Sequence, residues 1–99
     1  MFLIREVMHC RPGKAGELVK RFKQLEPIMK ELGQNRAQRV LTDMSGEPYW
    51  TVVAEQEVES LQQYLDGTRT MMGDARAQKI MQGYHDFVER GRREIFKIE

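Results

Sequence analysis

The spacing of hydrophobic positions changes its period along the chain, and each change marks a predicted element. Residues 2–10 (FLIREVMHC) carry apolar side chains on both faces of an extended chain, which is typical of a central strand covered on two sides. Residues 15–32 carry apolar side chains at steps of three and four, with lysines and glutamates between them, and Gly33 follows. This spacing predicts an amphipathic helix that ends at the glycine.

The middle of the chain predicts a hairpin. Residues 36–44 form a polar-rich segment typical of a strand near a sheet edge, and residues 45–47 (SGE) are turn formers. Residues 48–56 (PYWTVVAEQ) are aromatic and β-branched, as in a buried strand. We expect these two strands to pair antiparallel, with Tyr49 and Trp50 on opposite faces of the second strand.

The second half of the chain repeats the pattern of the first. Apolar positions in residues 58–65 predict a short helix, residues 66–68 (DGT) are expected to interrupt it, and apolar positions in residues 71–81 predict that it resumes. Residues 84–98 lead into one long last strand, because the side chains of residues 95–98 alternate between the two faces as in a strand. Gly91 is expected to form a bulge in that strand.

The elements follow one another in the order β-α-β-β-α-β. This order predicts an α+β, ferredoxin-like fold, in which a four-stranded antiparallel sheet carries both helices on one face. Residues 1–99 fit a single domain. The first strand is apolar on both faces, and a chain of this length buries only about two thirds of its unfolded surface. We therefore expect a second copy to cover the helix-free face and to form a homodimer.

Charge and composition exclude several classes of partner. Sixteen basic and fifteen acidic side chains give a net charge of +1, too little for the bulk attraction that nucleic acids and acidic membranes exert. The apolar runs are far shorter than the roughly 20 residues of a membrane span, and the N-terminus lacks the basic and apolar regions of a signal peptide. Cys10 is the single cysteine and lacks the spacing of a metal site. We expect a cytoplasmic protein with no metal, nucleic-acid or membrane partner.

Several short segments resemble a known family. They are residues 11–14 (RPGK) after the first strand, the end of the long helix at Gly33, residues 47–50 (EPYW) and residues 91–96 (GRREIF). With them the chain resembles the NIPSNAP-type branch of the dimeric α+β barrel superfamily, which also includes antibiotic-biosynthesis monooxygenase-like domains. The resemblance implies that two sheets face each other in a dimer, and that a small apolar or aromatic molecule, in some members haem, lies between sheet and helices. It fixes no reaction.

The sequence departs from the enzymes of that superfamily. Monooxygenase-like and haem-degrading relatives often carry a Trp near the end of the third strand and a His further along in the next helix, and the matching positions here hold Glu55 and Tyr64. Residues 2–10 also lack the Asn that such enzymes use on the first strand. These departures argue against cofactor-free oxygenation and haem breakdown, and no cofactor is expected.

Four side chains are candidates for the lining of a ligand pocket: His9, Trp50, Tyr64 and His85. A neutral imidazole is a suitable base near pH 7, whereas strand-end histidines are more often surface residues and buried aromatic side chains more often pack in the core. Methionines 29, 44, 71, 72 and 81 either form an adaptable pocket wall or fill gaps in the core. No catalytic set follows from these residues, so the sequence leaves open whether the protein is an enzyme.

The sequence favours a NIPSNAP-like protein that binds a small apolar or aromatic molecule between sheet and helices. The alternative is a small cofactor-independent monooxygenase or isomerase that acts on an aromatic substrate. An RNA-binding module shares the predicted topology but ranks last, because residues 48–51 lack the Gly-aromatic pattern and the chain lacks a basic field.

Overall fold

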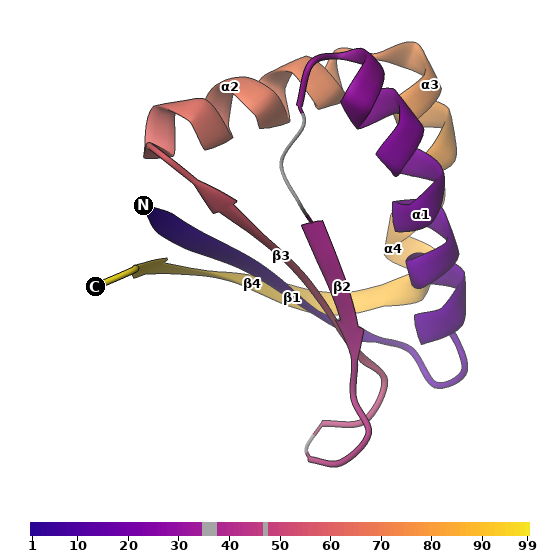
Figure 1. Ribbon diagram of the computed structural model, residues 1–99. Coiled ribbons are helices and arrows are strands. Elements are labelled where there is room, and N and C mark those ends of the chain that lie inside the picture. The colour runs from indigo at the N-terminus through magenta and orange to yellow at the C-terminus, as the bar shows by residue number, and fades with distance from the viewer. Residues whose placement is uncertain (35–37, 47) are drawn as a thin grey trace.

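The computed structural model describes residues 1–34, 38–46 and 48–99 (Figure 1). Its strands are β1 (Phe2–Cys10), β2 (Gln38–Thr42), β3 (Thr51–Val58) and β4 (Val88–Lys97). Its helices are α1 (Ala15–Glu31), α2 (Leu61–Met72), α3 (Ala75–Ile80) and α4 (Tyr84–Phe87).

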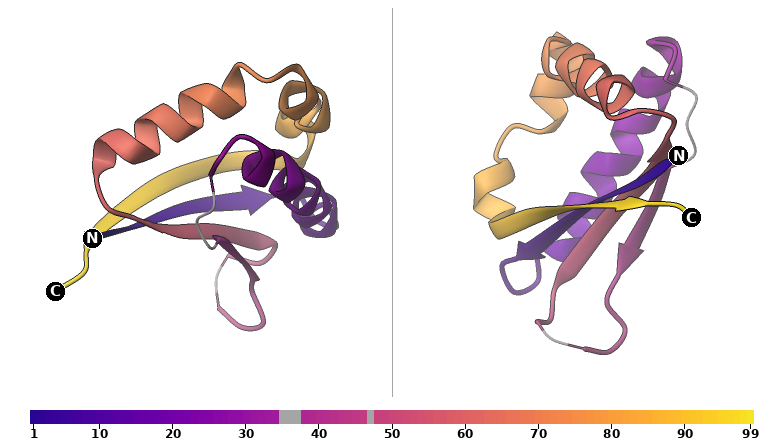
Figure 2. Two further views of the ribbon diagram at one scale, coloured as in Figure 1. Left: turned by 45° about the horizontal axis from the view of Figure 1, so that its top comes forward. Right: turned by 90° about the vertical axis from the view of Figure 1, so that its left-hand side faces the viewer.

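The four strands form one antiparallel sheet in the order β2-β3-β1-β4. The helices lie on one face of this sheet, and the described residues leave its other face open (Figures 1 and 2). This arrangement confirms the predicted α+β, ferredoxin-like fold. The central strands β1 and β3 therefore position side chains both under the helices and on the open face.

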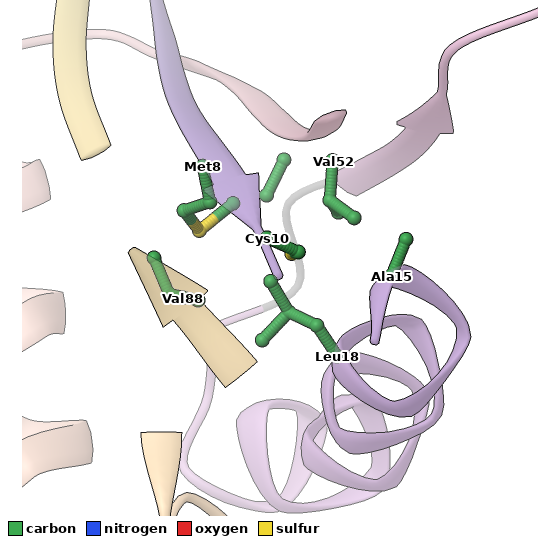
Figure 3. Close-up of a cluster of buried hydrophobic side chains, with 7 residues drawn as sticks. Met8, Cys10, Ala15, Leu18, Val52 and Val88 are labelled. Carbon is green, nitrogen blue, oxygen red and sulfur yellow. The ribbon is translucent and has the colours of Figure 1, made fainter. Parts of the chain in front are cut away.

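The core lies between the sheet and α1. Figure 3 shows Met8 and Cys10 of β1 and Val52 of β3 pointing toward Leu18 of α1. Their cluster of buried residues consists of Met8, Cys10, Ala15, Leu18, Val52, Ala54 and Val88. Leu18 is completely buried, and burial of such a side chain contributes about 2 kcal/mol to the free energy of unfolding. A second cluster, of Ile4, Val58 and Tyr64 with Phe2 packed against it, attaches α2 to the other end of the sheet.

The second helix is not interrupted where the sequence predicted. Residues 66–68 continue α2, and the helical run breaks instead at Gly73. Ser60 caps α2 by accepting a hydrogen bond from the Gln63 amide (3.1 Å), and Asp74 caps α3. A helix-interior glycine costs only about 1 kcal/mol relative to alanine, so the cap and the packing of Tyr64 outweigh it.

The third strand starts later than predicted, at Thr51. The Thr51 amide donates to the Asp43 carboxylate (2.8 Å), so a side chain ends the ladder between β2 and β3. Trp50 then adopts a left-handed backbone conformation, with φ of +61°. The expectation that Tyr49 and Trp50 face opposite ways on a strand is therefore wrong. The strand predicted over residues 36–44 is β2, and its residues 36 and 37, like residue 47 of the turn, lie outside the described residues.

The irregularity in the last strand does not lie at Gly91. His9 pairs with Arg90 whereas Cys10 pairs with Val88, so Glu89 is the extra residue. Gly91 pairs in regular register with Met8. The strand also begins later than predicted, because residues 84–87 form the short helix α4.

Candidate functional site

A cavity of about 160 Å³ lies between the helices and the sheet. Its lining residues come from α1, the segment after it, β2, β3 and α2: Phe22, Leu25, Met29, Gln34, Gln38, Gln56, Gly67, Thr68, Met71 and Met72. We call it the inter-layer cavity. An engineered apolar cavity of about 150 Å³ is known to hold benzene, so this volume fits one aromatic ring.

The walls of the inter-layer cavity combine flexible apolar side chains with a few polar groups. Three of the methionines singled out in the sequence, Met29, Met71 and Met72, line it. Thioethers adapt their shape to a ligand, as the pocket-wall interpretation of these residues requires. Gln38 and Gln56 are paired across β2 and β3 and present amide groups from the sheet side. Such a lining, mostly apolar with a few fixed polar groups, is typical of a small-molecule site.

Next to this cavity lies a cluster of ionisable side chains, Glu6, Tyr64 and Arg93, which we call the Glu6 cluster. The Tyr64 hydroxyl on α2 and the Nε of Arg93 on β4 both donate hydrogen bonds to Oε1 of Glu6 on β1. The Arg93 guanidinium also lies over the Tyr64 ring, 5.1 Å from its centroid. Thr68, one turn further along α2, interacts with the Tyr64 hydroxyl and lines the inter-layer cavity. The tyrosine therefore connects the cavity to the carboxylate.

The Glu6 cluster holds the tyrosine in its protonated form. Burial raises the pKa of Tyr64, and the hydrogen bond to Glu6 and the negative charge of Glu6 raise it further. Thr68 and the positive charge of Arg93 act in the opposite direction. The pKa of Tyr84 is also raised, by burial first and then by the negative charge of Glu6. At neutral pH the site therefore holds a phenol donor against a carboxylate, an arrangement that orients a polar group or relays a proton.

Glu6 and Arg93 were not among the residues singled out from the sequence. The signal that could have found Glu6 was the strand alternation, because Glu6 occupies a helix-facing position between the buried Ile4 and the buried Met8. A charge at such a position requires a partner under the helices. The sequence alone could not show on which face of the sheet Arg93 lies, because that depends on the irregularity at Glu89.

His9 lies on the open face of the sheet, away from the inter-layer cavity. Arg92 can only donate, so its contact with His9 Nε2 (3.1 Å) makes that nitrogen an acceptor. The proton therefore lies on Nδ1, which donates to the Thr51 hydroxyl oxygen (3.1 Å). Burial lowers the pKa of His9, and the positive charges of Arg90 and Arg92 lower it further. The imidazole is thus fixed in one neutral tautomer on the open face.

The other two candidates also lie apart. Trp50 lines a second cavity, of about 540 Å³, at the hairpin end of the sheet. His85 is exposed on α4, where its ring meets the ring of Tyr84 edge to face at 5.5 Å. The four candidate residues therefore do not form one site, and of them only Tyr64 belongs to the Glu6 cluster.

Charged side chains cross the open face of the sheet in a row, which we call the outer charge row: Arg39, Glu55, Arg5, Glu94 and Arg92. Glu55 is only 5% exposed and pairs with Arg39 on one side and Arg5 on the other. Glu94 pairs in turn with Arg5 and Arg92. Glu55 thus lies on the open face of the sheet, whereas Tyr64 lies on its helix-covered side.

The described residues contain no group of three or more His, Cys, Asp or Glu side chains placed to hold a metal ion. Within the same described part of the chain, no helix has the length and apolar character needed to cross a membrane.

Comparison with known proteins identifies the fold. No protein-family model and no curated protein matches the sequence. Among solved structures, an uncharacterised NIPSNAP domain protein from Burkholderia xenovorans matches 100% of this chain and 95% of its own, with a TM-score of 0.80 at 15% identity. A NIPSNAP family protein of unknown function from Agrobacterium tumefaciens matches with a TM-score of 0.83 at 18% identity, over 99% of this chain and 87% of its own.

A more distant match is a candidate antibiotic biosynthesis monooxygenase from Chloroflexus aurantiacus, with a TM-score of 0.71 at 9% identity over 99% of this chain and 92% of its own. The chain thus has the α+β fold of NIPSNAP family proteins, with a weaker similarity to the monooxygenase-like domains. The resemblance predicted from the sequence is confirmed as a likeness of fold. Of the two NIPSNAP proteins, the one from Burkholderia xenovorans is described as uncharacterised and the one from Agrobacterium tumefaciens as of unknown function.

Proposed function

We propose that this protein binds a small apolar or aromatic molecule in the inter-layer cavity, as a cytoplasmic homodimer. The observation that carries the proposal is the cavity itself, which has room for one ring, three methionines in its wall and amide groups at its sheet side. Thr68 and the Tyr64 hydroxyl beside it supply a polar end. A single-ring molecule with one hydroxyl group fits this combination best.

Methionine methyl groups provide the test of ligand binding. In protein labelled with ¹³C at the methionine methyls, p-cresol should shift the signals of Met29, Met71 and Met72 saturably. Met44, which is exposed in the hairpin, should not respond. Thr68→Leu should fill the cavity and abolish the shifts, whereas Thr70→Leu, at an exposed position of the same helix, should keep them. Equal shifts at Met44, or shifts unchanged in Thr68→Leu, would contradict the proposal.

The homodimer is supported by the chemistry of the open face. Apolar side chains that are partly exposed there, such as Leu41 and Phe96, flank the outer charge row. Because the signs alternate along the row, opposite charges of two copies can face each other when the two-fold axis passes between two neighbouring members, such as Arg5 and Glu94. The contact would also enlarge the buried surface of a 99-residue domain.

The molar mass in solution tests the dimer. Light scattering should give about twice the chain mass of 11.7 kDa. Val53 lies in the middle of the open face, opposite Val7 and Leu41, so Val53→Glu should reduce the mass to that of one chain. Leu61→Glu, at an exposed position on α2, is the matched control and should leave the mass unchanged. A monomeric wild-type protein would refute this part of the proposal.

A second candidate function is proton transfer on an aromatic substrate, as an isomerase would perform it. The Glu6 carboxylate and the Tyr64 phenol form a base and acid pair beside the inter-layer cavity, and this pair supports the alternative. Its test is the exchange of the methyl protons of acetophenone with D₂O, followed by NMR. Exchange that is lost in Glu6→Gln but kept in Glu17→Gln would support it. Exchange no faster than in buffer would exclude it for this ketone.

A further inference from the structure

The second cavity belongs to a different part of the molecule from the proposed ligand site. It is lined by the hairpin between β2 and β3 and by the first turn of α1. Figure 1 shows the hairpin and the start of α1 at the same end of the sheet. Six described residues line the cavity volume of about 540 Å³: Ala15, Gly16, Thr42, Asp43, Tyr49 and Trp50. We call it the hairpin cavity. Its volume falls within the usual range of small-molecule sites, roughly 300 to 1,000 Å³.

Two aromatic side chains form its wall although they are exposed to solvent. Tyr49 is 69% exposed and Trp50 is 44% exposed, so neither side chain is explained by the core. Trp50 is also the only non-glycine residue with positive φ among the described residues. A left-handed conformation is unfavourable for a large side chain, and it persists where surrounding contacts impose it.

Hydrogen bonds hold the backbone of this segment in that conformation. The Trp50 carbonyl oxygen accepts from the Cys10 amide (2.9 Å), which ties it to the end of β1. The Thr51 hydroxyl donates to the Pro48 carbonyl (2.7 Å), and the Thr51 amide donates to Asp43 Oδ1 (2.8 Å). The two aromatic rings and the carboxylate are therefore carried by a preorganised segment, which reduces the entropy lost on binding.

The charge of the lining selects the class of ligand. Among the six described lining residues, Asp43 is the only one with a charged side chain. A carboxylate in a cavity that Trp and Tyr also line attracts a cation, since aromatic faces carry negative potential, and it repels carboxylate and phosphate groups. Glu17, in the first turn of α1, opposes the partial positive charge of that helix start, to which the N-cap residue Lys14 adds a cationic side chain.

We propose that the hairpin cavity binds a small organic ammonium ion. Its charged head lies against the Asp43 carboxylate, and its alkyl groups lie against the rings of Tyr49 and Trp50. The site is separate from the inter-layer cavity, with which it shares no lining residue.

The chain offers a direct reporter, because Trp50 is its only tryptophan. Titration with choline should change the intrinsic fluorescence saturably. The neutral isostere 3,3-dimethylbutan-1-ol, which has the same shape without the charge, should bind roughly tenfold more weakly or not at all. Asp43→Asn keeps an oxygen for the Thr51 amide but removes the charge, so it should weaken choline binding by about the same factor.

Two further variants separate loss of the site from loss of the fold. Tyr49→Leu removes one aromatic wall at an exposed position and should weaken choline binding while the thermal unfolding temperature stays unchanged. Asp86→Asn, at an exposed acidic residue on α4, is the matched control and should bind choline as the wild type does. Equal affinity for choline and its neutral isostere, full affinity in Asp43→Asn, or no saturable response to choline would each overturn the proposal. p-Cresol binding reported by the methionine methyls is independent of all these outcomes.

Discussion

The hydroxyl of Tyr64 on α2 donates a hydrogen bond to the carboxylate of Glu6 in the middle of β1, across 58 positions of the sequence. The contact joins the second helix to the central strand at the only point where the helix-facing side of β1 carries a charge. Within the described residues it thus links the fold to the candidate site, because the same tyrosine lies beside the inter-layer cavity.

Removal of this hydrogen bond should destabilise the protein. Tyr64→Phe should lower the free energy of unfolding by about 1 to 2 kcal/mol, since it leaves a partly buried carboxylate with one donor fewer. Urea denaturation followed by circular dichroism measures the change. Tyr49→Phe, at a largely exposed hydroxyl, is the control and should leave the free energy of unfolding the same within error. An equal loss in both variants would show that the Glu6 contact is not responsible.

Stability should fall at alkaline pH. The pKa of Tyr64 is raised above its usual value of 10.0, so the unfolded chain releases this proton first. The stabilising contribution is complete below pH 10 and is lost as pH rises through the pKa of the folded state. Urea denaturation between pH 9 and pH 11 should show the decline, and Tyr64→Phe should show a shallower one. The same slope in both proteins would count against the assignment.

The free energy of unfolding should also fall at acid pH, because His9 becomes protonated. Its pKa is lowered from 6.5, so the unfolded chain binds a proton that the folded protein still excludes. The contribution is complete above pH 6.5 and is lost as pH falls toward the pKa of the folded state. An NMR titration of the His9 ring should have its midpoint below 6.5, and His9→Gln should flatten the pH dependence of unfolding in this range. A midpoint above 6.5 would contradict the prediction.

Substitution of two glycines by alanine should change the stability of the protein in opposite directions. A Cβ at Gly91 would lie 3.3 Å from the Val7 carbonyl oxygen in the central strand, so Gly91→Ala should destabilise the protein by about 1 kcal/mol. Gly16 has open space around it in the first turn of α1, so Gly16→Ala should stabilise the protein by about 0.5 to 1 kcal/mol. Thermal unfolding of the two variants beside the wild type tests both signs at once.

Among the residues of the outer charge row, Glu55 should contribute most to the free energy of unfolding. Glu55 is almost fully buried between Arg5 and Arg39, so Glu55→Gln should lower the free energy of unfolding by about 2 kcal/mol. Glu57, two residues further on the same face of β3, is exposed, and Glu57→Gln should change stability by less than about 0.5 kcal/mol. Urea denaturation of both variants makes the comparison. A smaller loss in Glu55→Gln than in Glu57→Gln would refute the assignment.

The elements with a clear period were predictable from the sequence. The first strand and the long helix follow from their apolar spacing, and the structure gives them as β1 and α1 with bounds that differ by a residue at most. The start of β3 was not predictable, because the aromatic residues before Thr51 resemble a strand in composition. The Asp43 side chain accepts a hydrogen bond from the Thr51 amide, which would pair with the neighbouring strand if the ladder were longer.

The candidate site was predictable only in part. Tyr64 was found as a polar aromatic residue on an amphipathic helix, but Glu6 and Arg93 become its partners only through the folding of β1, β4 and α2 onto one another. Gly67 resembles a helix breaker in a single sequence. In the structure it continues α2 and lines the inter-layer cavity.

The extra residue Glu89 has a consequence that reaches the whole of β4. Val88 and Arg93 both face the helices although they are an odd number of positions apart, which a regular strand does not allow. Had the strand kept strict alternation from Val88, Arg92 and Glu94 would point inward, and Arg93 would point outward with Ile95. One inserted position therefore decides which arginine lies on the helix-facing side of the sheet and which lies on its open face. The Glu6 cluster and the outer charge row both depend on this offset. A relative that lacks the extra residue would place Arg92 and Glu94 on the helix-facing side of the sheet and Arg93 on its open face, so it could form neither arrangement with these residues.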